Sequence, residues 1–266
     1  MNKKVTNLTI KKMKQEGMPI YMITTYDYIM AQNVDEAGID MILVGDSLGN
    51  VVQGGSSTLG VTVDDVIYHA RCVMRGCSLP FVVVDMPFGS YQVSDEDGVR
   101  NGIRILKETG AHAVKLEGGS RVLGVVRRLV DAGVPVMGHL GLTPQSVNVL
   151  SGYRVQGKGD DAETLYNDAL ALAQAGAFSL VLECVPRDLA KRVQDALDIP
   201  VVGIGAGPDT AGQVLVLQDC LGMTAAKKPK FVRKFASLAE TITDALRQYA
   251  AEVEAGTFPS DSESYH

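Results

Sequence analysis

The sequence predicts an α/β protein, a single-domain (β/α)8 TIM-type barrel with parallel strands. Short apolar runs rich in β-branched residues recur along its 266 residues, and most are continuous rather than alternating. Continuous runs are typical of strands that are buried on both faces, as in a parallel sheet. Amphipathic stretches lie between most of them, and a (β/α)8 barrel typically needs about 250 residues. We expect one domain over residues 1–255, including a short segment before the barrel, and a polar tail over 256–266.

Eight apolar runs mark the expected strands in chain order. They cover residues 20–27, 41–47, 80–87, 113–119, 134–141, 179–185, 200–207 and 213–219. Only "GAGPDTAG" separates the last two runs, which is short for a crossover helix, so we expect a single turn there. The segment 143–160 is long and rich in Gly, Ser and Gln. It is compatible with a functional loop or lid and equally with a surface excursion.

Four amphipathic segments between these runs are the clearest helices. They cover residues 62–76, 94–110, 120–133 and 161–176. Two of them begin with a hydroxyl residue that is followed three positions later by an acid, the pattern of an N-cap. These pairs are Thr62 with Asp65 and Ser94 with Asp97. Each segment ends on a glycine, where we expect a left-handed residue: Gly76, Gly110, Gly133 and Gly176.

Composition and charge argue against several classes of protein. The net charge is −6 and the isoelectric point is near 5.3, which disfavours a nucleic-acid-binding surface. The N-terminus lacks the apolar region of a signal peptide, and no apolar run approaches the roughly 20 residues that span a bilayer. The four cysteines form no CxxC pair, as expected in a reducing compartment. We expect a cytoplasmic protein that binds neither membranes nor nucleic acid.

Polar side chains stand where the expected strands end. The C-terminal ends of barrel strands build the active site, so these residues are the candidates. In chain order they are Asp27, Asp46, Ser47, Asp85, Lys115, Glu117, His139 and Glu183. Five are carboxylates, which would repel one another strongly in one partly buried place. A divalent cation, together with Lys115, would remove that conflict.

Asp46, Asp85 and Glu117 come from three successive strands. Hard oxygen ligands of this kind, without Cys or paired His, suit Mg²⁺ better than Zn²⁺. The alternative is that each acid caps a loop by accepting bonds from backbone N–H groups. For one such acid alone that alternative is favoured, but three on neighbouring strands favour a metal site.

Glu183 and His139 are the candidates for acid–base chemistry. Glu183 follows the apolar stretch "SLVL", and apolar surroundings tune a carboxylate towards general-base work near neutral pH. A strand-end cap or an ion pair with Arg187 is the alternative role. For an isolated histidine such as His139 a core position is the favoured interpretation, and only its strand-end position favours the site. Lys115 shares a face with Glu117 if the strand alternates, and it could pair with the acids or hold an anionic substrate.

Several motifs together resemble one family. "VGDSLG" (44–49), "KLEGG" (115–119) and "GHLGLTPQS" (138–146) occur in order, with further matches along nearly the whole chain. The sequence resembles the ketopantoate hydroxymethyltransferase family. The resemblance implies a (β/α)8 barrel that binds Mg²⁺ and transfers a one-carbon unit from 5,10-methylenetetrahydrofolate to 3-methyl-2-oxobutanoate. It also implies a cytoplasmic homo-oligomer, typically a decamer.

The resemblance assigns roles to individual residues. Asp46, Asp85 and Glu117 would be the metal ligands, and Glu183 would accept the proton. The substrate-binding residues would be Asp46, Ser47, Asp85, Lys115 and His139. Three positions depart from the family pattern, and none of them is a proposed metal or base position: Ser151, Lys158 and Ala211.

Two points stay open at the level of sequence. Tyr26, Phe88 and Tyr91 lie near the right end of the barrel to stack on a pterin, but packing explains each equally well. A Mg²⁺-dependent 2-oxo acid lyase or decarboxylase of the phosphoenolpyruvate/pyruvate barrel group is the alternative enzyme. Such enzymes usually carry a catalytic cysteine after the fourth strand, where this chain reads "LEGGSRVLG". A barrel that only binds a metabolite or partner would not need a base opposite a metal site.

Overall fold

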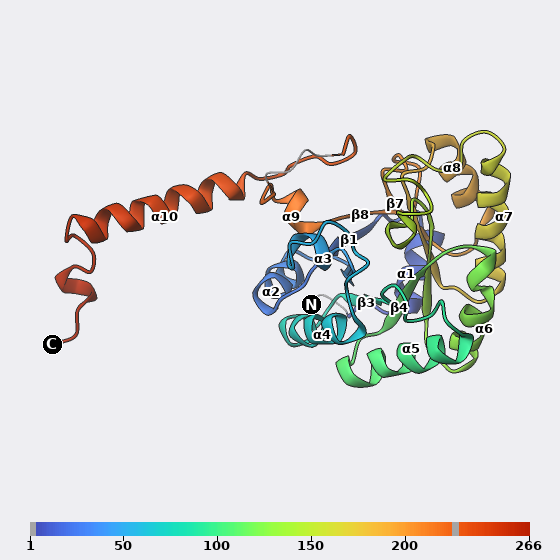
Figure 1. The fold of residues 1–266 in the computed structure, drawn as a ribbon, viewed down its shortest axis with the longest axis horizontal. Coiled ribbons are helices and arrows are strands. Elements are labelled where there is room, and N and C mark those ends of the chain that lie inside the picture. Colours follow the sequence, from blue (N-terminus) through green and yellow to red (C-terminus); the bar gives the residue numbers. More distant parts are fainter. Residues whose placement is uncertain (1–3, 225–228) are drawn as a thin grey trace. The chain divides into compact units, whose positions relative to one another are not determined.

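The computed structural model describes residues 4–224 and 229–266, and its centre is a closed barrel of eight parallel strands (Figure 1). Each strand pairs with its neighbour in chain order, and β1 pairs with β8 to close the barrel. The strands are β1 (Ile20–Thr24), β2 (Met41–Val44), β3 (Phe81–Asp85), β4 (Ala113–Glu117), β5 (Val136–Gly141), β6 (Ser179–Glu183), β7 (Val201–Ile204) and β8 (Gly212–Leu215). The predicted fold class is confirmed, and each strand lies within or beside its predicted run.

Helices connect most of the strands. The α-helices are α1 (Asn7–Gln15), α2 (Tyr28–Glu36), α3 (Leu48–Val51), α4 (Val63–Gly76), α5 (Asp95–Thr109), α6 (Leu123–Asp131), α7 (Asp161–Gln174), α8 (Arg187–Ala196), α9 (Leu217–Cys220) and α10 (Leu238–Glu254). Short 3₁₀ turns are η1 (Ser120–Val122), η2 (Pro144–Ser146) and η3 (Asp261–Glu263). Residues 205–211, between β7 and β8, contain no helical turn, so the single turn expected there was wrong. A parallel connection this short has no room for one.

The predicted helix ends are confirmed, but Gly76 lacks the left-handed conformation expected there. Thr62 and Asp65 form a reciprocal capping box at the start of α4, and the Ser94 side chain accepts the N–H of Asp97. Gly110 ends α5 at φ 75°, in the left-handed region. Gly76 is the last residue of α4 and is needed for another reason: a Cβ there would lie 2.4 Å from the Tyr28 carbonyl oxygen. Its lack of a side chain lets α4 approach α2 closely.

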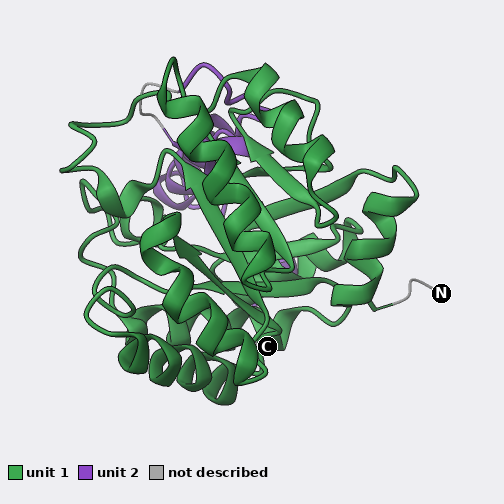
Figure 2. Ribbon diagram, turned by 90° about the vertical axis from the view of Figure 1, so that its right-hand side faces the viewer, with its two compact units in different colours: residues 1–216 green, residues 217–266 purple. Residues whose placement is uncertain are grey.

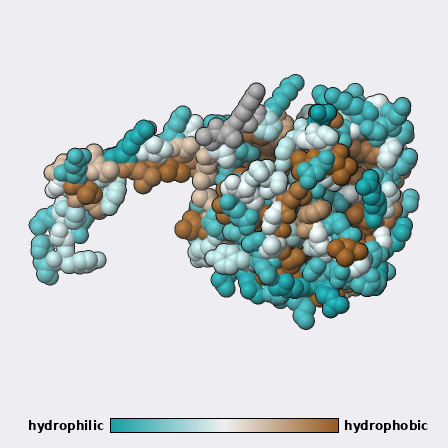
Figure 3. All heavy atoms as spheres, viewed as in Figure 1, coloured by the Kyte–Doolittle hydropathy of each residue, from teal (hydrophilic) through white to brown (hydrophobic). Residues whose placement is uncertain are grey.

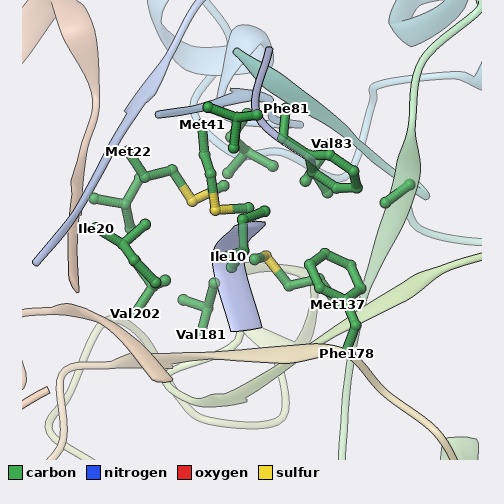
Figure 4. Packing of buried hydrophobic residues seen from close by; sticks show 14 of the residues in the cluster. Ile10, Ile20, Met22, Met41, Phe81, Val83, Met137, Phe178, Val181 and Val202 are labelled. Atoms are coloured by element: carbon green, nitrogen blue, oxygen red, sulfur yellow. The ribbon is translucent and has the colours of Figure 1, made fainter. Parts of the chain in front are cut away.

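The N-terminal end of the barrel is filled by apolar side chains. Ile10 of α1 is fully buried and packs among residues from the beginnings of several strands, including Met41 and Phe81 (Figure 4). Met13, also from α1, belongs to the same cluster. Burying one such side chain contributes about 1.5–3 kcal/mol. The segment before the barrel therefore closes one end of it.

The chain divides into two compact units, residues 1–216 and residues 217–266 (Figure 2). The first contains all eight strands. The second contains α9, α10 and η3, and α10 ends at Glu254, close to the expected residue 255. The single domain over 1–255 and the tail over 256–266 stay predictions.

The surface of each unit is mixed in character. Hydrophilic side chains are spread over the visible face of the barrel unit, and apolar side chains follow one side of α10 (Figure 3). Ile242, Leu246, Tyr249 and Val253 recur at helical spacing on α10, which makes that helix amphipathic. Within the described part of the chain, no helix is both long and apolar enough to cross a bilayer.

Candidate active site

Acids and a lysine from neighbouring strands meet, buried, at the C-terminal end of the barrel. Asp46 lies just beyond β2, Asp85 is the last residue of β3, and Lys115 and Glu117 lie on β4. Lys115 Nζ is 2.9 Å from Asp85 Oδ1 and 4.0 Å from Glu117 Oε1. The Asp46 N–H donates to Asp85 Oδ2 at 2.8 Å. The structure thus brings together Asp46, Asp85, Lys115 and Glu117, four of the residues proposed from the sequence.

Strand register explains this convergence. Asp85 is the partner of Lys115 across β3 and β4, and Glu117 is the partner of His139 across β4 and β5. Because side chains alternate along a strand, Lys115 and Glu117 share one face, as predicted. All of these side chains are less than 7% exposed, so water screens their charges poorly.

Burial and mutual repulsion dominate the electrostatics. Burial, together with the charges of Asp85 and Glu117, raises the pKa of Asp46 to about 8 against the opposing effects of Lys115 and Gln145. Burial also raises the pKa of Asp85. For Lys115, burial lowers the pKa, but the three carboxylates outweigh it and raise the pKa above its usual value. Lys115 is therefore a permanent cation among more negative charge than it can balance.

His139 links two acids. Its Nδ1 lies 3.2 Å from Glu117 Oε1, and its Nε2 lies 3.3 Å from Glu183 Oε2. Burial and Lys115 lower the pKa of His139, but Glu117 and Glu183 more than offset them and raise it to about 9. His139 Nδ1 also lies 3.2 Å from Lys115 Nζ, and the ring joins the acid cluster to Glu183, whose side chain is 17% exposed. His139 is thus part of the site rather than an isolated core residue.

Other proposed residues have clear local roles. Ser47 Oγ lies 2.6 Å from the hydroxyl of the buried Tyr26. Asp27 is exposed and caps α2, accepting the Met30 N–H at 2.9 Å, so it is not a fifth buried carboxylate. Arg187 pairs with Asp209 at the surface, which leaves Glu183 to His139. The structure therefore has an Arg187–Asp209 pair and a His139–Glu183 contact, and not the ion pair between Glu183 and Arg187 considered from the sequence.

The candidate aromatic residues differ in their surroundings. Tyr26 and Tyr91 are 2% and 3% exposed, and both use their hydroxyl groups in hydrogen bonds. Phe88 is 50% exposed. Of the three, Phe88 alone offers a free ring face of any size.

Sequence reasoning missed Gln145. It lies in η2, within the segment 143–160, and is 6% exposed. Its side-chain amide donates to Asp46 Oδ2 at 2.8 Å, and its backbone N–H donates to Glu117 Oε2 at 3.0 Å. Two signals were available: its place in the motif "GHLGLTPQS" (138–146) and its position in a segment too long to be a simple connection. This contact shows that the segment supplies part of the site.

The donor set fits a hard divalent cation. Asp85 Oδ1 and Glu117 Oε1 are buried without a hydrogen bond of normal geometry, and three carboxyl groups lie together in this cluster. Oxygen donors of this kind are what Mg²⁺ prefers. Within residues 4–224 and 229–266, no three His, Cys, Asp or Glu side chains are arranged, as they stand, to hold a metal ion. Lys115, 2.9 Å from Asp85, supplies positive charge at this place.

The fold and the site define a class: a (β/α)8-barrel enzyme with its polar groups at the C-terminal ends of the strands. The family model described as ketopantoate hydroxymethyltransferase matches residues 4–261. The chain belongs to that family and is a transferase.

Curated relatives match along their whole length. A protein of Heliobacterium modesticaldum named 3-methyl-2-oxobutanoate hydroxymethyltransferase is 54% identical over 266 residues, covering 100% of this chain and 96% of that one. A protein of the same name from Syntrophus aciditrophicus is 53% identical, covering 99% and 97%.

Solved structures show the same fold at low identity. Phosphonopyruvate hydrolase in complex with oxalate and Mg²⁺ superposes with a TM-score of 0.62 at 12% identity, covering 97% of this chain and 93% of that one. A 2,3-dimethylmalate lyase of the PEP mutase/isocitrate lyase superfamily gives 0.59 at 16%, covering 97% and 91%. At these identities the similarities show the fold alone.

Proposed function

We propose that the protein transfers a hydroxymethyl unit from 5,10-methylenetetrahydrofolate to 3-methyl-2-oxobutanoate, giving 2-dehydropantoate for pantothenate and coenzyme A biosynthesis. The names of the full-length relatives support this substrate. The observation that carries the proposal is the pairing of a buried acid cluster with the more accessible Glu183. The reaction of a 2-oxo acid needs both features. The acid cluster would hold a metal ion against the oxygens of the substrate, and Glu183 would be the base for its C3 proton.

Asp46, Asp85 and Glu117 would hold Mg²⁺. Bound there, the ion would act as a Lewis acid on the 2-oxo acid and make the C3–H bond more acidic. Lys115 would balance the charge of the substrate carboxylate, and Asp46, Ser47, Asp85 and His139 would line the substrate. Ser47 is held in place by the Tyr26 hydroxyl at 2.6 Å.

Glu183 is the proposed general base. Its carboxylate takes the C3 proton, and the electron pair of the broken C–H bond forms the enolate. Water replaces the two folate nitrogens on the methylene carbon: both C–N bonds break, the two protons of water go to the nitrogens, and tetrahydrofolate leaves. C3 then attacks that carbon, which is at the oxidation level of formaldehyde. A C–C bond forms, the C=O electron pair moves to oxygen, and the proton taken by Glu183 completes the hydroxyl group. His139 Nε2, 3.3 Å from Glu183 Oε2, orients the base from the buried side. Glu183 is thus anchored at one oxygen and partly open to solvent.

The test is hydrogen exchange at C3. Glu183→Gln should retain binding of Mg²⁺ and 3-methyl-2-oxobutanoate but lose C3–H exchange in deuterated water, measured by NMR. Arg187→Gln, which alters only the surface pair with Asp209, is the matched control and should exchange normally. Exchange at the normal rate in Glu183→Gln would remove Glu183 from the base role.

A second assay tests the substrate and metal. Turnover of 3-methyl-2-oxobutanoate should require the folate and should be lost on treatment with EDTA. Turnover that is independent of folate would instead favour a 2-oxo acid lyase or decarboxylase. We also propose a cytoplasmic homo-oligomer, a decamer, and light scattering on the purified chain would measure its mass.

A further inference from the structure

Gln145 occupies a central position between the proposed metal ligands. Its side chain is buried, and both of its polar atoms are engaged. Nε2 donates to Asp46 Oδ2 at 2.8 Å and to the Met86 carbonyl at 3.0 Å. Oε1 accepts from the Tyr91 hydroxyl at 2.7 Å and from the Gln92 amide at 3.0 Å. A buried amide with this complete set of partners is held in one conformation.

The direction of these hydrogen bonds follows from Tyr91. The backbone N–H of Glu117 donates to the Tyr91 hydroxyl at 3.0 Å, so the hydroxyl must donate its own proton elsewhere. Its shortest acceptor is Gln145 Oε1 at 2.7 Å, compared with 3.2 Å to the Glu117 carbonyl. A flipped amide would place its oxygen against the Met86 carbonyl, which cannot donate, and its –NH2 against the Gln92 amide nitrogen, which cannot accept. Tyr91 therefore fixes which end of the amide faces Asp46.

The backbone of Gln145 holds a second acid. Gln145 follows Pro144 at the start of η2, where a backbone N–H has no partner within the turn. It donates instead to Glu117 Oε2 at 3.0 Å. A single residue from the segment after β5 therefore restrains carboxylates from beyond β2 and from β4. Each restraint uses one oxygen of the acid.

We propose that Gln145 is a positioning residue for the metal ligands and that Tyr91 acts through it. The inference rests on the proposed function, because it takes Asp46 and Glu117 to hold Mg²⁺. Gln145 sets the rotamer of Asp46 through its side chain and that of Glu117 through its backbone. Groups that orient metal ligands in this way typically change metal affinity or activity by about 10–100-fold when removed.

The experiment compares Mg²⁺ binding by the purified full-length chain and its variants, measured by isothermal titration calorimetry. Gln145→Met keeps an unbranched side chain of similar length but removes both the donor and the acceptor. We expect its Kd for Mg²⁺ to rise about 10-fold or more. Gln156→Met is the matched control, because the Gln156 side chain bonds only to the nearby Arg154 carbonyl. It should leave the Kd unchanged.

Tyr91→Phe removes a single oxygen atom. It tests the same contacts, from Tyr91 to Gln145 and from Gln145 to Asp46, if Gln145→Met does not fold. Its Kd for Mg²⁺ should also rise, by less than that of Gln145→Met. The double variant should bind no more weakly than Gln145→Met alone, because residues acting in series are not additive. At low Mg²⁺ the KM for the keto acid should rise, and excess Mg²⁺ should restore it. A purely structural defect would not be rescued by metal.

Two outcomes overturn the inference in distinguishable ways. If the unmodified chain binds Mg²⁺ and a folded Gln145→Met or Tyr91→Phe variant binds it equally well, the positioning role is wrong and the proposed function stands. If the unmodified chain binds no Mg²⁺ at any concentration, the metal assignment of the proposed function fails, and the positioning role fails with it.

Discussion

The two ends of the barrel bury different chemistry. At the N-terminal ends of the strands, Ile10, Met41 and Phe81 form a continuous apolar cluster. At the C-terminal ends, Asp85, Lys115 and Glu117 are just as deeply buried, yet they are charged. Burying apolar groups stabilises the fold directly, whereas burying charges costs free energy unless each is paired. The difference shows that one end holds the barrel together and the other holds groups that stability alone does not require.

The largest expected effect comes from removing the cation of the charged end. Lys115→Met leaves Asp85 without its cation, and breaking a buried pair in this way costs about 3–5 kcal/mol. We expect this loss in the free energy of unfolding, measured by urea denaturation without metal, together with loss of turnover. Added Mg²⁺ should restore part of the stability but not the activity. Lys191→Met, at an exposed pair with Asp195, is the control. If Lys115→Met loses no more free energy of unfolding than this control, the contrast between the two ends of the barrel is contradicted.

A smaller loss of stability is expected at the apolar end, with no loss of catalysis. Ile10→Ala removes fully buried side-chain atoms from the cluster, and such changes cost about 2–5 kcal/mol. Thermal unfolding should shift accordingly, while kcat at a temperature where the chain is folded stays unchanged. Leu8→Ala in the same helix serves as the control, since Leu8 is 79% exposed. A drop in kcat for folded Ile10→Ala would show that the two ends are not independent.

The smallest expected effects are on the pH dependence of stability, which should differ between a histidine at one end of the barrel and a histidine at the other. Glu117 and Glu183 overcome burial and Lys115 to raise the pKa of His139 from 6.5 to about 9. The stability from His139 is therefore complete below pH 6.5 and is lost as pH rises to about 9. His112, stacked on Phe81, has its pKa lowered by burial and by Lys4, so its stabilising effect is lost as pH falls below 6.5.

Thermal unfolding of the metal-free chain across pH 5–10 would measure how stability changes with pH on the alkaline side and on the acidic side. His139→Gln should flatten the alkaline side, and His112→Asn should flatten the acidic side. If His139→Gln instead changes the pH dependence of stability on the acidic side, His139 is neutral in the folded, unmodified chain.

Elements that depend on local or periodic information were predictable. The eight apolar runs, the cap at Thr62 and the left-handed Gly110 are properties of neighbouring residues, and the structure confirms them. Gly76 was misread because its constraint is contact with α2, which no local pattern encodes. Asp27 was placed in the acid cluster because a strand-end acid and a helix cap look identical in a sequence. The assignment of metal ligands and of the base Glu183 stays a prediction.

The sequence by itself determined the barrel, its family and the polar residues at the strand ends, because strand period, helix caps and family motifs are written in short stretches. Only the tertiary structure decided which of those residues share a site. Gln145 lies 99 positions from Asp46 along the chain, yet their side chains are 2.8 Å apart. Such a contact depends on register and barrel closure, which arise from the packing of all eight strands together.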